Sequence, residues 1–100
     1  MQIPEEFNQF VIGIYPGIPR DDGSLESLAA AGLEMSSAKQ RRAVLAFLNE
    51  LLDGGYSDAD IEDAWNVQSP SYNFSAGGHR VFLEIVRRQI IGDKDRNLPG

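Results

Sequence analysis

The segment SSAKQRRAVLAFLNELLDGG, residues 36–55, constrains the fold more than any other part of the chain. Ser37 and Gln40 have the spacing of a capping box, in which the two side chains satisfy backbone N–H groups at the start of a helix. The apolar residues that follow recur at helical spacing and form one wide face: Val44, Leu45, Leu48, Leu51 and Leu52. The glycine pair at 54–55 is typical of a helix end. The segment therefore predicts a long helix at the centre of the core.

Four further segments show the same helical period. One runs from Pro4 to about Tyr15, one begins at Ser24, one begins at the capping pair Ser57 and Asp60, and the last follows the loop SPSYNFSAGG and ends at Gly92. The apolar stripe of the last helix is predicted to consist of Val81, Phe82, Ile85, Val86 and Ile90. Gly32 leaves the end of the second of these helices uncertain. The residues predicted to be buried together are Phe10, Ile14, Leu45, Leu48, Leu52, Trp65, Phe82, Ile85 and Val86.

A chain of 100 residues is long enough for one domain with one core. No alternating strand pattern or internal repeat competes with the helical interpretation, although FVIGIY has enough β-propensity to leave a strand there as an alternative. We therefore predict an all-α fold, a compact single-domain bundle of about five helices over residues 1–92. Residues 93–100, DKDRNLPG, have no apolar stripe and are expected to form a polar tail.

The chain contains no cysteine, which excludes disulfides, thiolate metal sites and a cysteine nucleophile. Its first residues lack a basic region, and their apolar stretch is too short to span a bilayer. We accordingly expect a cytoplasmic protein that makes no membrane contact.

The charge is acidic overall, with a formal net charge of −6, and it is unevenly distributed. Residues 1–37 hold six acids and one base, and residues 53–63 hold five acids and no base. Binding to a phosphate backbone requires a continuous basic surface, so direct contact with nucleic acid is disfavoured. A solvated acidic surface explains the pattern, and a basic protein partner is the functional alternative.

His79 is the single histidine, and general acid–base catalysis needs a second group to orient it. His79 directly follows Gly78 at a predicted helix start, a position that favours a side chain that faces solvent or caps the helix. The stretch DDGSL resembles a carrier-protein attachment site, but capping by Ser24 explains it better. The acids of DADIED lack the glycine and glutamate of a calcium loop. We predict no enzyme activity, no catalytic residue, no metal, no cofactor and no small-molecule substrate.

Aromatic residues gather near the end of the chain. Trp65 is predicted to lie in the core, on the inner side of its helix. Tyr72 and Phe74 lie in a polar loop, where aromatic side chains either hold the loop against the core or are available to bind a partner.

Three segments together resemble a known family: FNQFVIGIY, RAVLAFLNELLDGGYSDADIEDAW and SYNFSAGGHRVFLEIVRRQI. The chain is similar, from Phe7 to Ile91, to the small helical immunity proteins of bacterial contact-dependent growth inhibition systems. The resemblance implies a protein that binds the C-terminal toxin domain delivered by a neighbouring cell, often a nuclease, and blocks its active site or its access to substrate. A small acidic carrier or adaptor domain, and an enzyme that uses His79, remain the alternatives.

An acidic binder suits a basic nuclease surface, so the two acidic stretches are the predicted contact with the toxin. The predicted partner-binding residues are Asp21, Asp22, Glu26, Asp58, Asp60, Glu62, Asp63 and Tyr72.

Overall fold

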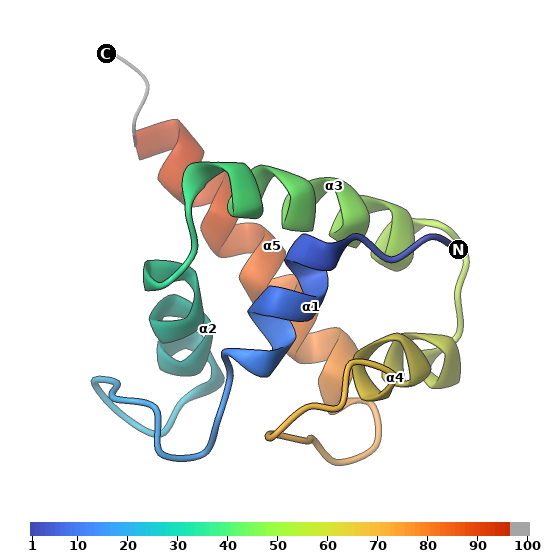
Figure 1. The fold of residues 1–100 in the computed structure, drawn as a ribbon, viewed down its shortest axis with the longest axis horizontal. Helices are drawn as coiled ribbons and strands as arrows, with labels where there is room; N and C mark the ends of the chain where they lie inside the picture. The colour runs from blue at the N-terminus through green and yellow to red at the C-terminus, as the bar shows by residue number, and fades with distance from the viewer. Residues whose placement is uncertain (97–100) are drawn as a thin grey trace.

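The structure, a computed structural model, describes the backbone of residues 1–96 and the side chains of residues 1–92. Over this range the chain forms helices and no strand, which confirms the all-α single domain (Figure 1). The five helices are α1 (Glu5–Ile12), α2 (Leu25–Glu34), α3 (Ala38–Asp53), α4 (Asp58–Asn66) and α5 (Gly78–Arg96). The stretch FVIGIY belongs to α1 and the turn after it. Among these helices none is both long and apolar enough to cross a membrane.

Helix α5 organises the bundle, since it packs against α2, α3 and α4, while α1 packs against α3 (Figure 1). Residues from all five helices join one hydrophobic core. In Figure 1, α2 lies at one end of the long axis and α4 at the other, with α5 running between them. The ends of the molecule that carry α2 and α4 are therefore separate surfaces.

Three of the helices begin as their capping signals predict. The Ser24 hydroxyl accepts a hydrogen bond from the Ser27 amide at 3.1 Å. Complete capping boxes start α3, through Ser37 and Gln40, and α4, through Ser57 and Asp60. These bonds satisfy amides that a helix start leaves without a partner.

The predicted core is confirmed for seven of its nine residues, and two lie at its edge. Leu45 and Leu52 are half-buried, whereas Phe47 is buried with its ring centroid 4.8 Å from that of Phe7. The α3 residues that enter the core are Val44, Phe47, Leu48 and Leu51. Their i, i+3, i+4, i+7 spacing forms a narrower stripe than the face predicted from sequence.

Helix α5 differs from prediction at both of its ends. Val81, predicted to face the core, is 49% exposed, and the helix continues through Gly92 to Arg96 instead of ending there. Part of the predicted polar tail is therefore helical, and residues 97–100 lie outside the described range. Near its start, Arg80 forms an ion pair with Asp58 and donates to the Tyr56 carbonyl at 2.8 Å, which ties α5 to α4.

Gly32 lies inside α2, which runs through it to Glu34, and it is buried against α1. A Cβ atom at this position would overlap Ile14 Cδ1 and lie 3.2 Å from Phe10 Cε1. The glycine therefore allows α1 and the chain after it to approach α2 closely.

Replacing Gly32 by alanine is expected to destabilise the protein, although alanine favours a helix by about 1 kcal/mol over glycine. The added methyl group overpacks a filled core, a change that typically costs about 1–3 kcal/mol. Urea unfolding measures the difference. Gly92→Ala in α5 is the control, because a Cβ there meets nothing within 4 Å, and it should stabilise the protein. Equal stabilisation by both substitutions would contradict the close contact.

Candidate functional site

His79 is buried, with 2% of its surface exposed, which corrects the prediction that it faces solvent or caps the helix. Its Nε2 lies 2.9 Å from Asn73 Oδ1, and its buried Nδ1 has no hydrogen-bond partner. The ring packs at a steep angle against Trp65 and Phe74, at centroid distances of 6.1 and 5.2 Å. The reason is helical phase, since the buried stripe of α5 begins at this residue and continues through Phe82, Leu83 and Val86.

Burial lowers the pKa of His79 from its ordinary value of 6.5, and the charge of Glu62 opposes this effect. The unfolded chain therefore binds the proton more readily than the folded protein in the window below 6.5. We expect the free energy of unfolding to rise with pH across this window. Above the window, His79 should no longer contribute to the pH dependence of stability.

Urea unfolding between about pH 5.5 and pH 7.5 tests this expectation, since histidine titrates there and most carboxylates stay ionised. His79→Gln provides the comparison, because glutamine is polar but does not titrate. The wild-type protein should lose more stability than the variant as the pH falls. Parallel pH profiles would show that His79 is not held neutral by burial.

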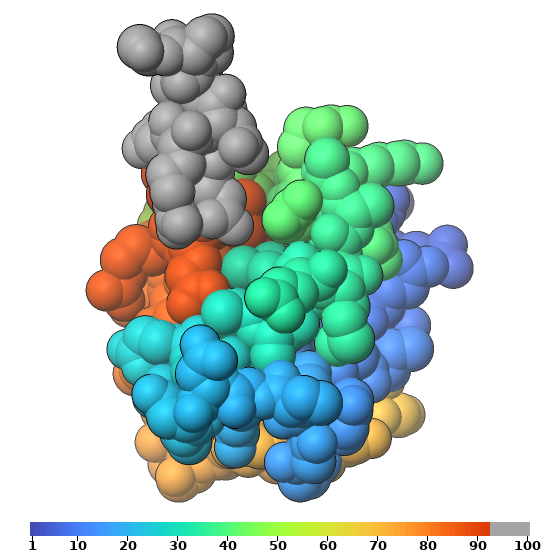
Figure 2. Space-filling view, turned by 90° about the vertical axis from the view of Figure 1, so that its left-hand side faces the viewer, coloured from blue at the N-terminus to red at the C-terminus, as the bar shows by residue number. Residues whose placement is uncertain are grey.

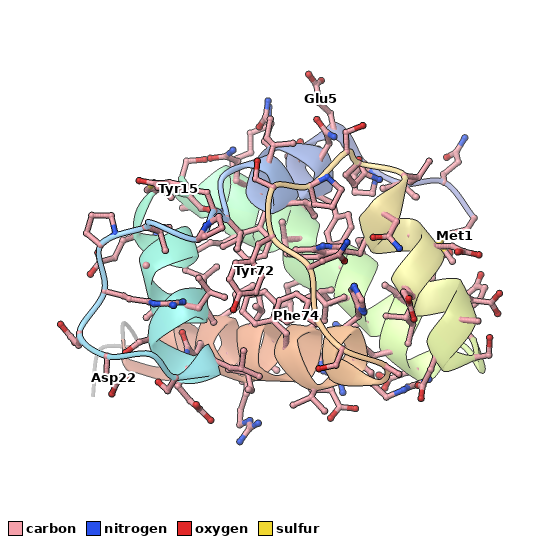
Figure 3. The ribbon with its side chains drawn as sticks, turned by 90° about the horizontal axis from the view of Figure 1, so that it is seen from below. Met1, Glu5, Tyr15, Asp22, Tyr72 and Phe74 are labelled. Atoms are coloured by element: carbon pink, nitrogen blue, oxygen red, sulfur yellow. The ribbon has the colours of Figure 1, made fainter. Side chains whose placement is uncertain are left out.

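The aromatic loop between α4 and α5 lies against the core, so the structure supports the first of its two predicted roles. Trp65 is buried, as predicted, and its Nε1 donates to the Tyr72 carbonyl at 2.8 Å. Phe74 stacks on Phe82 with a centroid distance of 4.8 Å, and Tyr72 packs on Phe74 at 5.0 Å. Both loop rings are half-buried and lie under the loop in Figure 3.

One group of predicted contact residues lies at the α2 end of the molecule. Asp21, Asp22 and Glu26 are all exposed, and Asp22 stands at the outer edge of the loop before α2 (Figure 3). Asp22 Oδ1 accepts from the Ser24 amide at 2.9 Å. Hydrogen bonding by Ser24, first through its side chain, lowers the pKa of Asp22. Figure 2 shows this loop and α2 covering the face at that end.

The second group lies on α4, and its four acids occupy different environments. Asp58 pairs with Arg80, and Asp60 Oδ2 accepts the Ser57 amide at 3.1 Å. Glu62 is half-buried and lies near enough to His79 to affect its pKa. Asp63 is exposed. Of these four acids, only Asp60 and Asp63 line the open pocket on one side of α4.

The two acidic groups therefore do not form one surface. Figures 1 and 3 place the loop before α2 and helix α4 at opposite ends of the long axis. A partner that covers the outward side of α4 would not also cover Asp21 and Asp22. The acids that were predicted together as the contact with the toxin therefore lie at two separate ends of the molecule.

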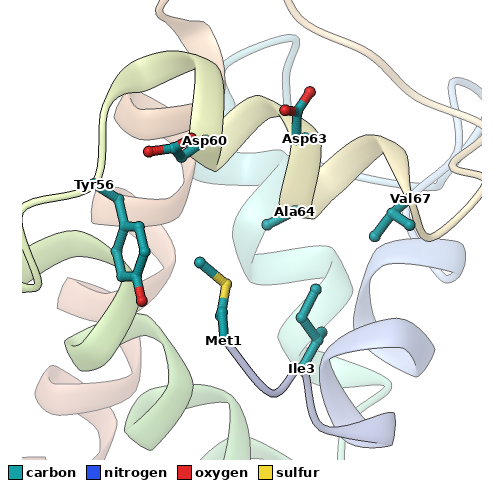
Figure 4. Close-up of a pocket in the computed structure, with 7 residues that line it drawn as sticks. All are labelled: Met1, Ile3, Tyr56, Asp60, Asp63, Ala64 and Val67. Carbon is teal, nitrogen blue, oxygen red and sulfur yellow. The ribbon is translucent and has the colours of Figure 1, made fainter.

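The pocket beside α4 has a volume of about 350 Å³ and is open to solvent. Its lining residues are Met1, Ile3, Tyr56, Asp60, Asp63, Ala64 and Val67. In Figure 4, Met1 and Ile3 lie across from Ala64, Tyr56 and Val67 stand at the two ends, and the two aspartates follow the α4 edge. Large apolar side chains remain exposed here, with Val67 at 68% and Met1 at 52%.

The apolar part of this pocket was missed by the sequence analysis. Three lining residues of α4 and its C-cap residue have the helical spacing i, i+3, i+4 and i+7, a pattern visible in the sequence: Asp60, Asp63, Ala64 and Val67. The position of Met1 and Ile3 beside α4 could not be predicted from the sequence, because it depends on how α1 packs in the bundle.

No protein family, curated protein or solved structure matches this chain. Within the described residues, no group of three or more histidine, aspartate or glutamate side chains is placed to hold a metal ion.

Proposed function

We propose that this protein binds and neutralises a toxin domain by direct contact, as do the contact-dependent growth inhibition immunity proteins that its sequence resembles. The toxin is expected to be a nuclease, and the protein is expected to act in the cytoplasm, where a delivered nuclease would meet its substrate. We assign the contact to the end of the molecule that carries α4.

One observation carries this assignment: the outward side of α4 combines exposed apolar side chains with carboxylates at their edge. Protein interfaces commonly have this anatomy, an apolar centre inside a polar rim. Val67 and Met1 supply exposed apolar surface, and Asp63 supplies charge. Asp21, Asp22 and Glu26, at the α2 end, do not line this pocket.

The charge of this surface suits a nuclease in particular. A nuclease binds phosphate through basic side chains, and carboxylates on an inhibitor attract the same groups. Such a contact would compete with the nucleic acid for the toxin surface, whether it covers the active site or only the path to it. Opposite charges also speed the encounter of two proteins.

The direct test is to produce the protein together with the toxin domain encoded immediately upstream of its gene. We expect the two to co-purify as a complex and the toxin's nuclease activity to be lost in its presence. Failure to bind or inhibit that domain, with both proteins folded, would reject the proposed function.

A further inference from the structure

We infer that the pocket beside α4 receives an arginine side chain of the bound toxin. This inference rests on the proposed function, which it deepens by naming the chemistry that the pocket recognises. Three properties of the pocket lead to it: the spacing of its aspartates, their lack of a cation partner within the described residues, and the nature of its walls.

The two aspartates lie one helical turn apart on the same side of α4. Residues at i and i+3 are neighbours on a helix surface, and like charges placed there repel each other. Asp60 lies in the first turn, where the helix dipole favours a negative charge, but Asp63 lies beyond it. The repulsion is relieved when a cation binds between or beside the two carboxylates.

Within the described residues no ion pair involves Asp60 or Asp63, not even one with the α-amino group of Met1, which lines the same pocket. The ion pairs found there join Arg80 to Asp58 and Arg87 to Asp53. The capping bond occupies one oxygen of Asp60, which leaves its other oxygen, and both oxygens of Asp63, able to accept further hydrogen bonds. A cation for these two carboxylates would therefore come from a partner.

The walls favour a long side chain whose stem is apolar. Ile3, Ala64 and Val67 offer aliphatic surface, and Tyr56 offers an aromatic ring at one end. Arginine fits such a site better than lysine, because its guanidinium binds carboxylates through several N–H groups, stacks on aromatic rings and is less strongly hydrated. The volume of about 350 Å³ is at the low end for ligand pockets, which suits a single side chain.

The probe for this inference is butylguanidinium, which carries the guanidinium group of arginine on an alkyl stem one carbon longer than the arginine side chain, with butylurea as its uncharged counterpart. Amide chemical shifts of the isotopically labelled protein are followed by NMR as each probe is added. We expect butylguanidinium to shift the amide signals of Asp63, Ala64 and Val67 in a saturable manner, and butylurea to shift them much less. Butylammonium, added separately, should bind more weakly than butylguanidinium.

Matched variants establish whether the two aspartates are responsible. The variant D60N/D63N should weaken butylguanidinium binding about three- to tenfold, the range expected for two exposed ion pairs. Asparagine keeps an acceptor for the Ser57 amide, so α4 should remain intact. The variant D21N/D22N removes the same charge at the other end of the molecule and should leave binding at the pocket unchanged.

Equal shifts with butylguanidinium and butylurea, equal weakening by both variants, or no saturable shift at the pocket would each overturn the inference. None of these results depends on the toxin. A protein that neutralises its toxin but does not bind butylguanidinium in this pocket would retain the proposed function and lose only the arginine site. Binding of the probe without toxin neutralisation would reject the proposed function instead.

Discussion

Replacing Leu48 by alanine is expected to lower the free energy of unfolding by about 2–5 kcal/mol, the usual range for truncating an interior leucine. Leu48 is fully buried in the middle of α3, the helix that packs against both α1 and α5. The truncation removes apolar contacts and leaves a cavity that the surrounding helices fill only in part. A single domain has about 5–15 kcal/mol of total stability, so a large fraction would be lost. Urea unfolding followed by circular dichroism measures the change.

Leu52→Ala is the matched control, because it removes the same atoms one turn further along the same helix. Leu52 is only half-buried at the edge of the core, so its truncation exposes the site to water rather than leaving a closed cavity. We expect a clearly smaller loss of stability. Similar losses for Leu48→Ala and Leu52→Ala would mean that the face of α3 is rotated from its described position.

The second large effect is expected in the rate at which the protein associates with its toxin. The variant D60N/D63K reverses or removes both charges beside the α4 pocket and should slow association about tenfold or more at low ionic strength. Salt should affect the variant less than the wild-type protein, because the attraction that salt screens has been removed. Stopped-flow or surface-based association rates across a salt series provide the measurement.

The control for this experiment is D21K/D22N, which changes the net charge by the same amount at the α2 end. In each variant the introduced asparagine can still accept the hydrogen bond that the aspartate accepted, from the Ser24 amide in the control and from the Ser57 amide in D60N/D63K. If association is steered by the α4 end, the control should slow it much less. A stronger effect of the control would move the contact surface to the loop before α2.

Glu62 is left unchanged in this design because of where the structure places it. The sequence alone groups Glu62 with Asp63 as acids beyond the capping positions of the helix. In the structure Glu62 is half-buried, and its charge opposes the lowering of the pKa of His79, so a lysine there would also change the electrostatic environment of a buried α5 residue. If a variant with lysine at position 62 bound the toxin less well, the cause could be either the changed charge or a change in folding.

The sequence by itself determined the local features of this protein. The capping boxes at Ser37 and Ser57 close within four consecutive residues, and the helical period acts over one or two turns. Neither depends on the rest of the chain. For this reason the existence of the five helices, the starts of α2, α3 and α4, and most of the core could be predicted without a structure.

Only the tertiary structure decided which faces those helices bury and which surfaces they share. The packing of His79 against Trp65, the close approach of Gly32 to Ile14 and the pocket between Ile3 and α4 each bring together residues that are distant in sequence. The same is true of the separation of the two acidic groups. The physical reason is that a side chain's burial depends on the elements packed around it, whereas its helical conformation depends mainly on its nearest neighbours along the chain.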